Sequence, residues 1–501
     1  MVPMKTFHVP DDANDPGWRS RYRWTVWLNA LQTLAILLRN ALACVVFVWV
    51  AAFIFSHGAF VSGRSAARQT DFEFLAGTSV STHLFFYGMV IGAHTPNLLP
   101  LEFTRLQQQR RRTTLLFCAQ RLAWRTFPVY VLTLLLLVGF LLLARSAPQG
   151  FRELHPEFYA SATCIHLYFA SLSVALRRIF REETVIGQSG QRTRSPQKRA
   201  SCWTPTRFFW KTWARSLPIL GSVMLAGIYV GYASQYGVDG GWDFLGYTLG
   251  SLMLKAVIKE AAKRWTRRRK IRDPRQIFLI VGLPTVLIDT QVRIVLQRAQ
   301  NSQFALAWVF GMAGFELVMR VSKVAWVKRQ LRRWDSRLAS AVMNDVHAGH
   351  AGGGAKIASV VEKRFGSLRD DTREIEGKVQ EVAFQIAESY ANMSAEYIAI
   401  GCSSCILYFY WDHPKYDLHH KVGASSAVGS DPQSPMWLQG SVLALQLAVE
   451  VVIDYVSCVV EIGEGIDFPE IRRYHVYLGL LFSCIACANI YVCSMVYMIV
   501  G

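Results

Sequence analysis

Long apolar stretches recur along most of the chain, separated by shorter polar segments. Eleven of them approach the roughly 20 residues that an α-helix needs to cross the hydrocarbon core of a bilayer. They lie at 41–61, 77–96, 127–144, 159–176, 216–235, 240–258, 277–296, 303–319, 392–411, 436–460 and 475–500. The pattern predicts an all-α fold, a polytopic transmembrane helix bundle of about 11 spans.

The apolar character of these stretches is uneven. The stretch at 127–144 has no charged residue, which predicts a helix that faces lipid. Several others contain ionisable side chains. A membrane protein tolerates such side chains when they face the interior of its bundle or water, so these weaker stretches are expected to lie on the inside.

The basic residues between the stretches test this topology. With a cytoplasmic N-terminus, the inner loops 97–126, 177–215 and 259–276 carry 6, 10 and 9 Lys and Arg. Each of the first four outer loops carries two or fewer, and so does 412–435. Cytoplasmic loops of membrane proteins are enriched in Lys and Arg. The sequence therefore predicts that the N-terminus is cytoplasmic.

Composition supports a membrane protein. Of the residues, 52% are hydrophobic and 18% are charged, and the formal net charge is +19. A soluble domain usually has about 25% charged residues. The basic clusters lie beside predicted spans, so we expect them to contact anionic lipid headgroups, and no nucleic acid is predicted as a partner. Most of the ten cysteines lie in apolar stretches, which is typical of helix packing.

Four regions follow from these patterns. Residues 1–40 are predicted to be a cytoplasmic N-terminus that contains an interfacial helix, and the polar start of the chain predicts no cleavable signal peptide. Residues 41–319 hold the first eight spans with their basic cytoplasmic loops. Residues 320–391 form a cytoplasmic region with a basic amphipathic helix, a Gly-rich linker and a further helix. Residues 392–501 hold the last three spans.

The sequence makes a specific prediction at the start of the first span and at the start of the ninth. Residues 24–38 and 41–61 together are too long for one span, and Arg39 with Asn40 suggests a break between an interfacial helix and the first span. In contrast, 371–391 continues without a helix breaker into the ninth span. That segment is predicted to extend as one rod from the cytoplasm into the membrane.

Polar side chains form a stripe on each of two C-terminal spans. At about 100° per residue, the polar residues of each helix fall within an arc of about 80°. They are Glu388, Asn392, Glu396 and Ser403 on one helix, and Gln446, Glu450, Asp454, Ser457 and Glu461 on the other. Lipid cannot solvate such stripes, so each is expected to face protein or water.

Three carboxylates are the main functional candidates. If the two helices are adjacent, Glu396, Glu450 and Asp454 can bind and release protons or, when ionised, bind cations. Arg293 is their expected counter-charge. We interpret these residues as an acidic path through the membrane, which favours a transporter or a channel-like protein.

Two neighbouring pairs belong to the same candidate path. Asp289 lies four residues before Arg293, and Glu316 lies four residues before Arg320, so each pair can also neutralise itself within its own helix. The alternative interpretation is structural. Buried polar pairs fix helix contacts, and the protein is then a non-catalytic scaffold or sensor whose basic cytoplasmic face binds lipid.

A second alternative is a metal-dependent membrane enzyme. His413, His419 and His420 lie with two aspartates in one predicted outer loop, and these residue types bind divalent metals. The chain has no zinc-hydrolase helix motif, nucleotide-binding loop or nucleophile elbow in a suitable context. The sequence therefore predicts no cofactor and favours a protein that is not an enzyme. It does not indicate a substrate or a particular membrane.

Overall fold

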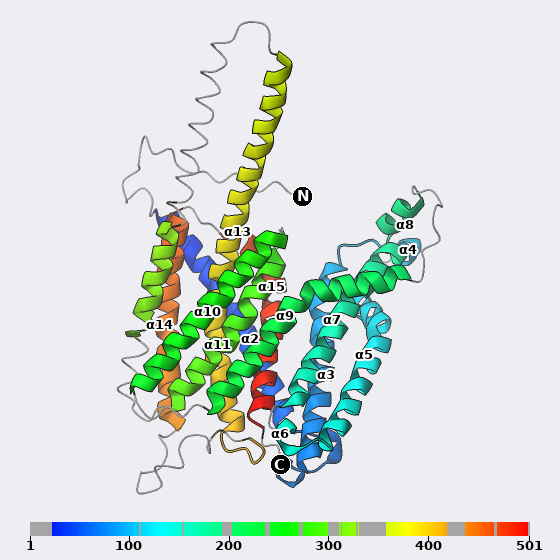
Figure 1. Cartoon of the computed structure of the whole chain (residues 1–501), viewed down its shortest axis with the longest axis vertical. Coiled ribbons are helices and arrows are strands. Elements are labelled where there is room, and N and C mark those ends of the chain that lie inside the picture. Colours follow the sequence, from blue (N-terminus) through cyan, green and yellow to red (C-terminus); the bar gives the residue numbers. More distant parts are fainter. Residues whose placement is uncertain are drawn as a thin grey trace.

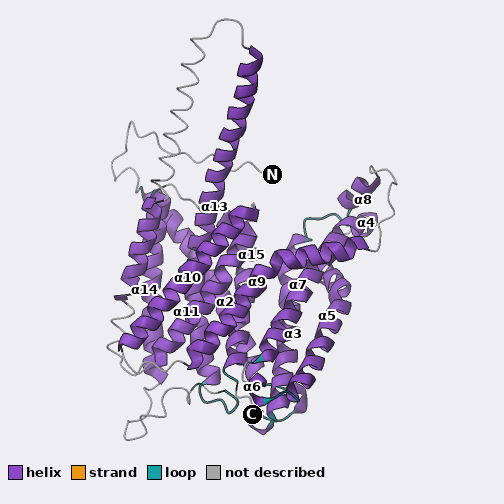
Figure 2. Ribbon diagram, in the orientation of Figure 1, coloured by secondary structure: helices purple, strands orange, loops and turns teal. Residues whose placement is uncertain are grey.

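The computed structural model of the chain is all-α (Figure 2). It describes residues 23–109, 112–152, 155–192, 203–235, 241–269, 274–298, 310–311, 313–326, 329, 357–416, 418, 436–464 and 468–498. Within those ranges, pairing between extended segments is limited to two isolated bridges, Phe103 with Thr184 and Tyr416 with Met498. The all-α prediction is confirmed.

Six helices are long and apolar enough to cross a membrane, so the protein is an integral membrane protein with several spans. They are α2 (Trp24–Ser56), α3 (Asp71–His94), α5 (Leu115–Arg145), α7 (Pro156–Glu183), α14 (Met436–Gly463) and α15 (Pro469–Val496). They coincide with six of the eleven apolar stretches, including the featureless one at 127–144.

The other five stretches fall wholly or partly on further helices. These are α9 (Trp203–Gln235), α10 (Gly241–Arg269), α11 (Pro274–Arg298), the helical segment 313–326 and α13 (Ile357–Tyr410). Short elements lie in the connections: η2 (Phe60–Ser62), η3 (Ala66–Arg68), η4 (Thr95–Asn97), α4 (Thr104–Gln108), α6 (Gln149–Arg152) and α8 (Val185–Arg192).

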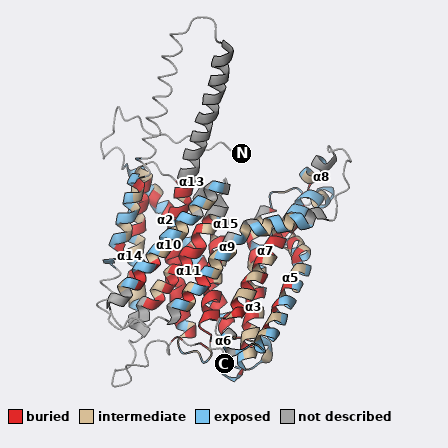
Figure 3. Cartoon of the chain, in the orientation of Figure 1, coloured by how far each residue is buried: buried red, intermediate tan, exposed pale blue. Residues whose placement is uncertain are grey.

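The long helices form two packed groups (Figure 1). In one group α3, α5 and α7 pack on one another around the side chains of Leu122, Tyr130 and Tyr168. In the other, α2 packs against α13, α14 and α15, and α11 packs against α10 and α13. Helix α9 contacts α7, α11 and α15 and so joins the two groups. Buried residues are most continuous along α11, α13 and α15 (Figure 3).

Helix α5 presents the apolar surface that its sequence predicts. Leu132, Leu135, Leu136, Leu142 and Leu143 are all exposed on the protein surface. A soluble protein rarely exposes so large a contiguous patch of leucine side chains. These side chains therefore contact the lipid of the bilayer, in agreement with the expected lipid-facing helix.

The expected break at Arg39 and Asn40 is wrong. Helix α2 runs without interruption for 33 residues from Trp24 to Ser56. The polar Asn40 is tolerated because its Nδ2 donates hydrogen bonds to Tyr390 Oη at 3.3 Å and to the His475 carbonyl at 3.0 Å. These bonds to α13 and α15 satisfy the amide inside the bundle, so the helix has no reason to end there.

The predicted continuity of 371–391 with the ninth apolar stretch is confirmed, because one helix covers both. Helix α13 has 54 residues and extends well beyond the ends of the neighbouring helices (Figure 1). Near its C-terminal end, Cys402, Cys405 and Ile406 are fully buried in the core of the bundle. The end of the bundle from which α13 projects is called the rod side below.

Close packing of α2 on α13 depends on Gly401. A Cβ atom at this position would lie 2.3 Å from Cγ2 of Val45 on α2. We expect Gly401→Ala to lower the free energy of unfolding by about 1–3 kcal/mol because the two helices must separate. Thermal unfolding in detergent micelles measures this change.

Gly250 on α10 provides the matched control. A Cβ atom there meets no other atom within 4 Å. Gly250→Ala should leave the stability unchanged or raise it by up to about 1 kcal/mol, since alanine is the better helix former. Equal effects of the two substitutions would contradict the proposed close approach.

Candidate functional site

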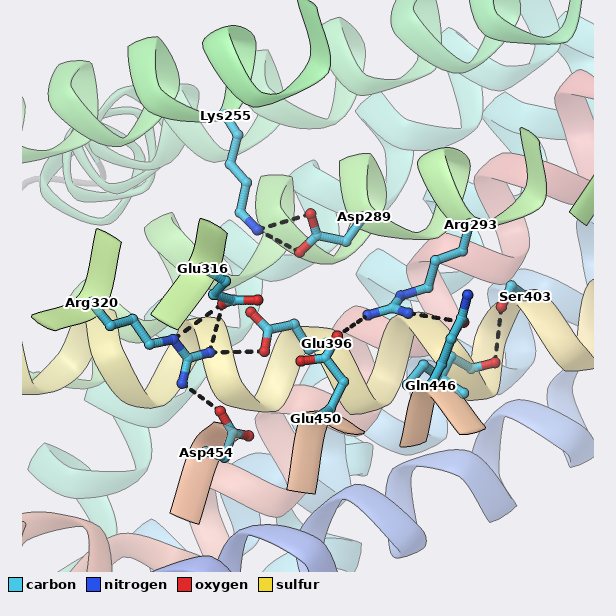
Figure 4. A network of polar contacts seen from close by, with 11 residues as sticks. Lys255, Asp289, Arg293, Glu316, Arg320, Glu396, Ser403, Gln446, Glu450 and Asp454 are labelled. Atoms are coloured by element: carbon cyan, nitrogen blue, oxygen red, sulfur yellow. Dashed lines mark hydrogen bonds and ion pairs between the residues drawn. The ribbon is translucent and has the colours of Figure 1, made fainter. Parts of the chain in front are cut away.

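Arg320 is the centre of a buried network of charges (Figure 4). It extends from segment 313–326, and its Nη2 donates to Glu316 at 2.7 Å and to Glu396 of α13 at 2.8 Å. Its Nη1 donates to Oδ1 of Asp454 on α14. The side chains of Glu396 and Asp454 are 4% and 0% exposed. One guanidinium therefore connects three helical segments.

Arg293 forms the second part of the network. From α11 it donates to Oε1 of Glu450 at 2.9 Å and to Oε1 of Gln446 at 3.1 Å, both on α14 (Figure 4). Gln446 and Glu450 are one helical turn apart, so they present their oxygens to the same guanidinium. The contact of Arg293 with a carboxylate of another helix is one of the two arrangements that the sequence allowed.

Lys255 and Asp289 form the third part. Lys255 Nζ on α10 donates to both carboxylate oxygens of Asp289 on α11, at 2.7 and 2.8 Å (Figure 4). Asp289 thus bonds to a neighbouring helix, although its spacing also allowed a pair with Arg293. Sequence reasoning missed Lys255. The available signal was a lysine near the end of the predicted span 240–258, a position that is costly unless the cation has a partner.

Carboxylates outnumber cations in this network. Among the residues that the structure describes, three basic side chains of the network face five acidic ones, so two negative charges remain if all of these groups are ionised. Each of Glu396, Glu450 and Asp454 has one oxygen that forms a hydrogen bond. The second oxygen of each is buried and has no hydrogen-bond partner among the described residues. An unpaired buried carboxylate oxygen is costly, so these three atoms have unused capacity for a proton or a cation.

Three carboxylates lie close enough together to share a ligand. One oxygen each from Glu316, Glu396 and Glu450 lies within 4.8 Å of the other two. At this separation, ionised carboxylates repel one another unless a positive charge lies between them. A proton shared between two of them, or one cation bound by all three, relieves that repulsion. This triad is the part of the described structure that is best suited to hold a metal ion.

The polar stripes extend beyond the triad and face protein, as expected. Toward the rod side, Ser389 of α13 donates to Glu461 of α14, and Lys323 pairs with Glu388 at 2.5 Å. Gln446, Ser457 and Glu461 are all buried. Ser403 donates to the carbonyl of Ile400 in its own helix and does not join the network.

The histidine loop has a different arrangement. His413 Nε2 donates to the Ser56 carbonyl at 2.8 Å, and its Nδ1 accepts the backbone N–H of Lys415 at 3.2 Å. Both ring nitrogens are therefore engaged within the protein, which leaves no lone pair for a metal. His419 and His420, the other two candidate metal ligands, lie outside the described residues.

The environment of His413 makes the stability of the folded protein depend on pH. Burial against Phe74 and Tyr416 lowers the pKa of His413 below its usual value. The imidazole of His413 then binds a proton more readily in the unfolded chain than in the folded protein. The free energy of unfolding should therefore fall as the pH drops below about 6.5. His413→Gln should reduce this loss, as measured by thermal unfolding at neutral and mildly acidic pH. The same pH dependence in the variant and the wild type would contradict the assignment.

Comparison of the chain with models of protein families, with curated proteins and with solved structures gives no match. The geometry of the site is therefore the basis on which a function can be argued.

Proposed function

We propose that this protein is a membrane transporter in which the acidic network binds and releases protons, or a cation in their place. The observation that carries this proposal is the excess of two carboxylates over cations in the buried network, together with the three unpaired oxygens of Glu396, Glu450 and Asp454. Protonation of two carboxylates makes the network neutral. Release of those protons restores its affinity for cations.

A network with a purely structural role would have a different composition. Buried charges that only hold helices together are stable when every group has a partner, because each unpaired atom loses its hydration without compensation. Here, three oxygens on α13 and α14 have no hydrogen-bond partner in the part of the chain that the structure describes. A scaffold or sensor remains the second candidate, since Arg320 alone joins Glu316, Glu396 and Asp454 and so stabilises the bundle.

Arg320 also provides a route from proton binding to movement. Its guanidinium holds α13 and α14 to segment 313–326 through Glu396 and Asp454. Protonation of either carboxylate replaces a charge-assisted hydrogen bond by a weaker neutral one. The contact between those helices is then weakened, and a bundle with two packed arrangements shifts toward the one that releases Arg320. Coupled transport requires a link of this kind.

The topology belongs to the same proposal. All eleven helical regions cross the membrane, and the N-terminus lies on the cytoplasmic side with the long basic loops. The support is the distribution of Lys and Arg, which are concentrated in alternate loops. The basic side of the protein then contacts anionic lipid headgroups through residues such as Arg264 and Arg268, both of which are exposed on α10.

Proton movement by the purified protein tests the function. Proteoliposomes that contain a pH-sensitive dye inside are given a membrane potential, and the internal pH is followed. We expect the wild type to carry protons and Glu396→Gln to lower the rate by about a hundredfold, because the amide cannot exchange a proton. Glu396→Gln keeps the size of the side chain and a polar contact to Arg320, so the variant is expected to fold.

Glu73→Gln is the matched control. Glu73 lies in the first turn of α3, far from the network, where it pairs with the exposed Arg64 at 3.8 Å. This variant should carry protons at the wild-type rate. Proton movement that is unchanged in Glu396→Gln, or absent from the wild type in the presence of a potential, would contradict the proposed function and favour the scaffold.

A further inference from the structure

A row of lysines lies on one face of α10. Lys255, Lys259 and Lys263 follow one another at intervals of four residues, so they occupy neighbouring turns on the same side of the helix. The row leads from the charged network toward the last turns of α10, which end at Arg269. Of the three, Lys255 belongs to the network described above, through Asp289, and Lys259 and Lys263 do not.

Two of these lysines are held by neighbouring side chains. Lys255 pairs with Asp289, and Lys263 lies over the rings of Trp326 and Phe384, with its Nζ 5.4 and 5.7 Å from the ring centroids. Lys259, between them, is half-buried and forms neither a hydrogen bond nor an ion pair with any residue that the structure describes. A half-buried ammonium without a partner is costly.

The surroundings of Lys259 are positive. Four charged side chains are near enough to act on the ammonium of Lys259: Lys255, Lys323, Glu388 and Asp289. Both carboxylates, however, are already bound, Asp289 by Lys255 and Glu388 by Lys323. Carboxylates outnumber basic groups in the acidic network. Around Lys259 the reverse holds, because both nearby carboxylates already have a lysine partner and the charge of Lys259 has none.

The positive cluster is only partly covered by protein. The side chain of Lys323 is 33% exposed, although its ammonium is paired with Glu388, whose side chain is 10% exposed. Lys259, Lys263 and Lys323 are all partly exposed. An oxyanion beside Lys259 accepts charge-assisted hydrogen bonds from an ammonium group that has no carboxylate partner among the described residues.

We infer that Lys259, with Lys323 and Lys263 beside it, binds a small soluble oxyanion, a carboxylate or a phosphate. Lys259 supplies the main hydrogen bonds, and the two neighbouring ammonium groups supply a favourable field. That this anion is the transported substrate rests on the proposed function. Protons that enter the acidic network would then accompany the anion and offset its charge.

Binding of oxyanions to the full-length protein tests this site directly. The protein is placed in nanodiscs of neutral phosphatidylcholine, and sodium phosphate or sodium acetate is titrated against sodium chloride at constant ionic strength. We expect saturable binding of at least one oxyanion, measured by calorimetry and by a rise in the unfolding temperature. Lys259→Gln should weaken that binding about tenfold or more, and Lys259→Arg should retain it.

Lys211→Gln is the control, because Lys211 is exposed on α9 and lies outside the cluster. It should bind the oxyanion as the wild type does. Binding that is as tight in Lys259→Gln as in the wild type would overturn the inference. So would the absence of saturable binding of phosphate and acetate, or stabilisation by anionic phosphatidylglycerol alone, which would assign the cluster to lipid headgroups.

The two proposals can fail separately. Glu396→Gln should lower the rate of proton movement about a hundredfold and leave the affinity for the oxyanion unchanged. If protons move and no oxyanion binds, only the inference about Lys259 falls. If the oxyanion binds at Lys259 and no protons move, the proposed function falls and an anion-binding membrane protein remains.

Discussion

Replacement of Arg320 by glutamine should produce the largest loss of stability of any single substitution in the network. The change leaves Glu316, Glu396 and Asp454 buried without their common cation. Removal of one partner from a buried ion pair costs about 3–5 kcal/mol, because the remaining charge is neither hydrated nor paired. With three carboxylates affected, we expect a loss at the upper end of this range. Chemical unfolding of the protein in detergent micelles measures it.

Two further variants define the cause. Arg320→Gln with Glu396→Gln should recover part of the lost stability, since one of the stranded carboxylates is removed with the cation. Arg264→Gln is the matched control, because Arg264 forms an exposed pair with Glu260 four residues earlier, at 3.2 Å. That pair contributes at most about 1 kcal/mol. A loss from Arg320→Gln no greater than that from Arg264→Gln would show that the network around Arg320 is not formed.

Reversal of the pair between Arg293 and Glu450 should give the second-largest effect. Arg293→Glu places two carboxylates opposite each other on α11 and α14, and Glu450→Arg places two guanidinium groups there. Each single substitution should cost about 3–5 kcal/mol. The double substitution, which restores opposite charges, should recover about 0.5–3 kcal/mol relative to the sum of the single effects.

A double-mutant cycle of unfolding free energies measures this coupling. Strictly additive effects would mean that Arg293 and Glu450 are not in contact. The result also bears on the orientation of α14, because Gln446, Glu450 and Asp454 share one face of that helix, and the first two bond to the same guanidinium.

The helices were predictable because hydrophobic length and period depend only on local sequence. The same is true of the stripes, since residues such as Glu450 and Asp454 must share a face at a spacing of four. The break at Arg39 and Asn40 was wrong for a non-local reason. Asn40 is satisfied by Tyr390, which is 350 residues away in the chain, and nothing near Asn40 in the sequence indicates that partner.

Partners across helices were equally hard to predict. Spacing alone allowed Asp289 to pair with Arg293, but α10 brings Lys255 to Asp289 and α14 brings Glu450 to Arg293. Arg320 was expected to pair with Glu316 within its own helix. It does so, and it also binds carboxylates of two other helices. Which of several nearby charges pair depends on how the helices pack, and spacing along one helix does not contain that information.

The central claim is that the buried carboxylates of the network exchange protons. Infrared spectroscopy measures this most directly, because a protonated carboxyl group has a C=O stretching band that is separate from that of the carboxylate. The full-length protein in lipid is moved from mildly alkaline to mildly acidic pH in D2O, and the difference spectrum is recorded. The account predicts a band from a buried carboxylic acid that changes with pH, is lost in Glu396→Gln and persists in Glu73→Gln. A difference spectrum that is the same in wild type and Glu396→Gln would contradict it.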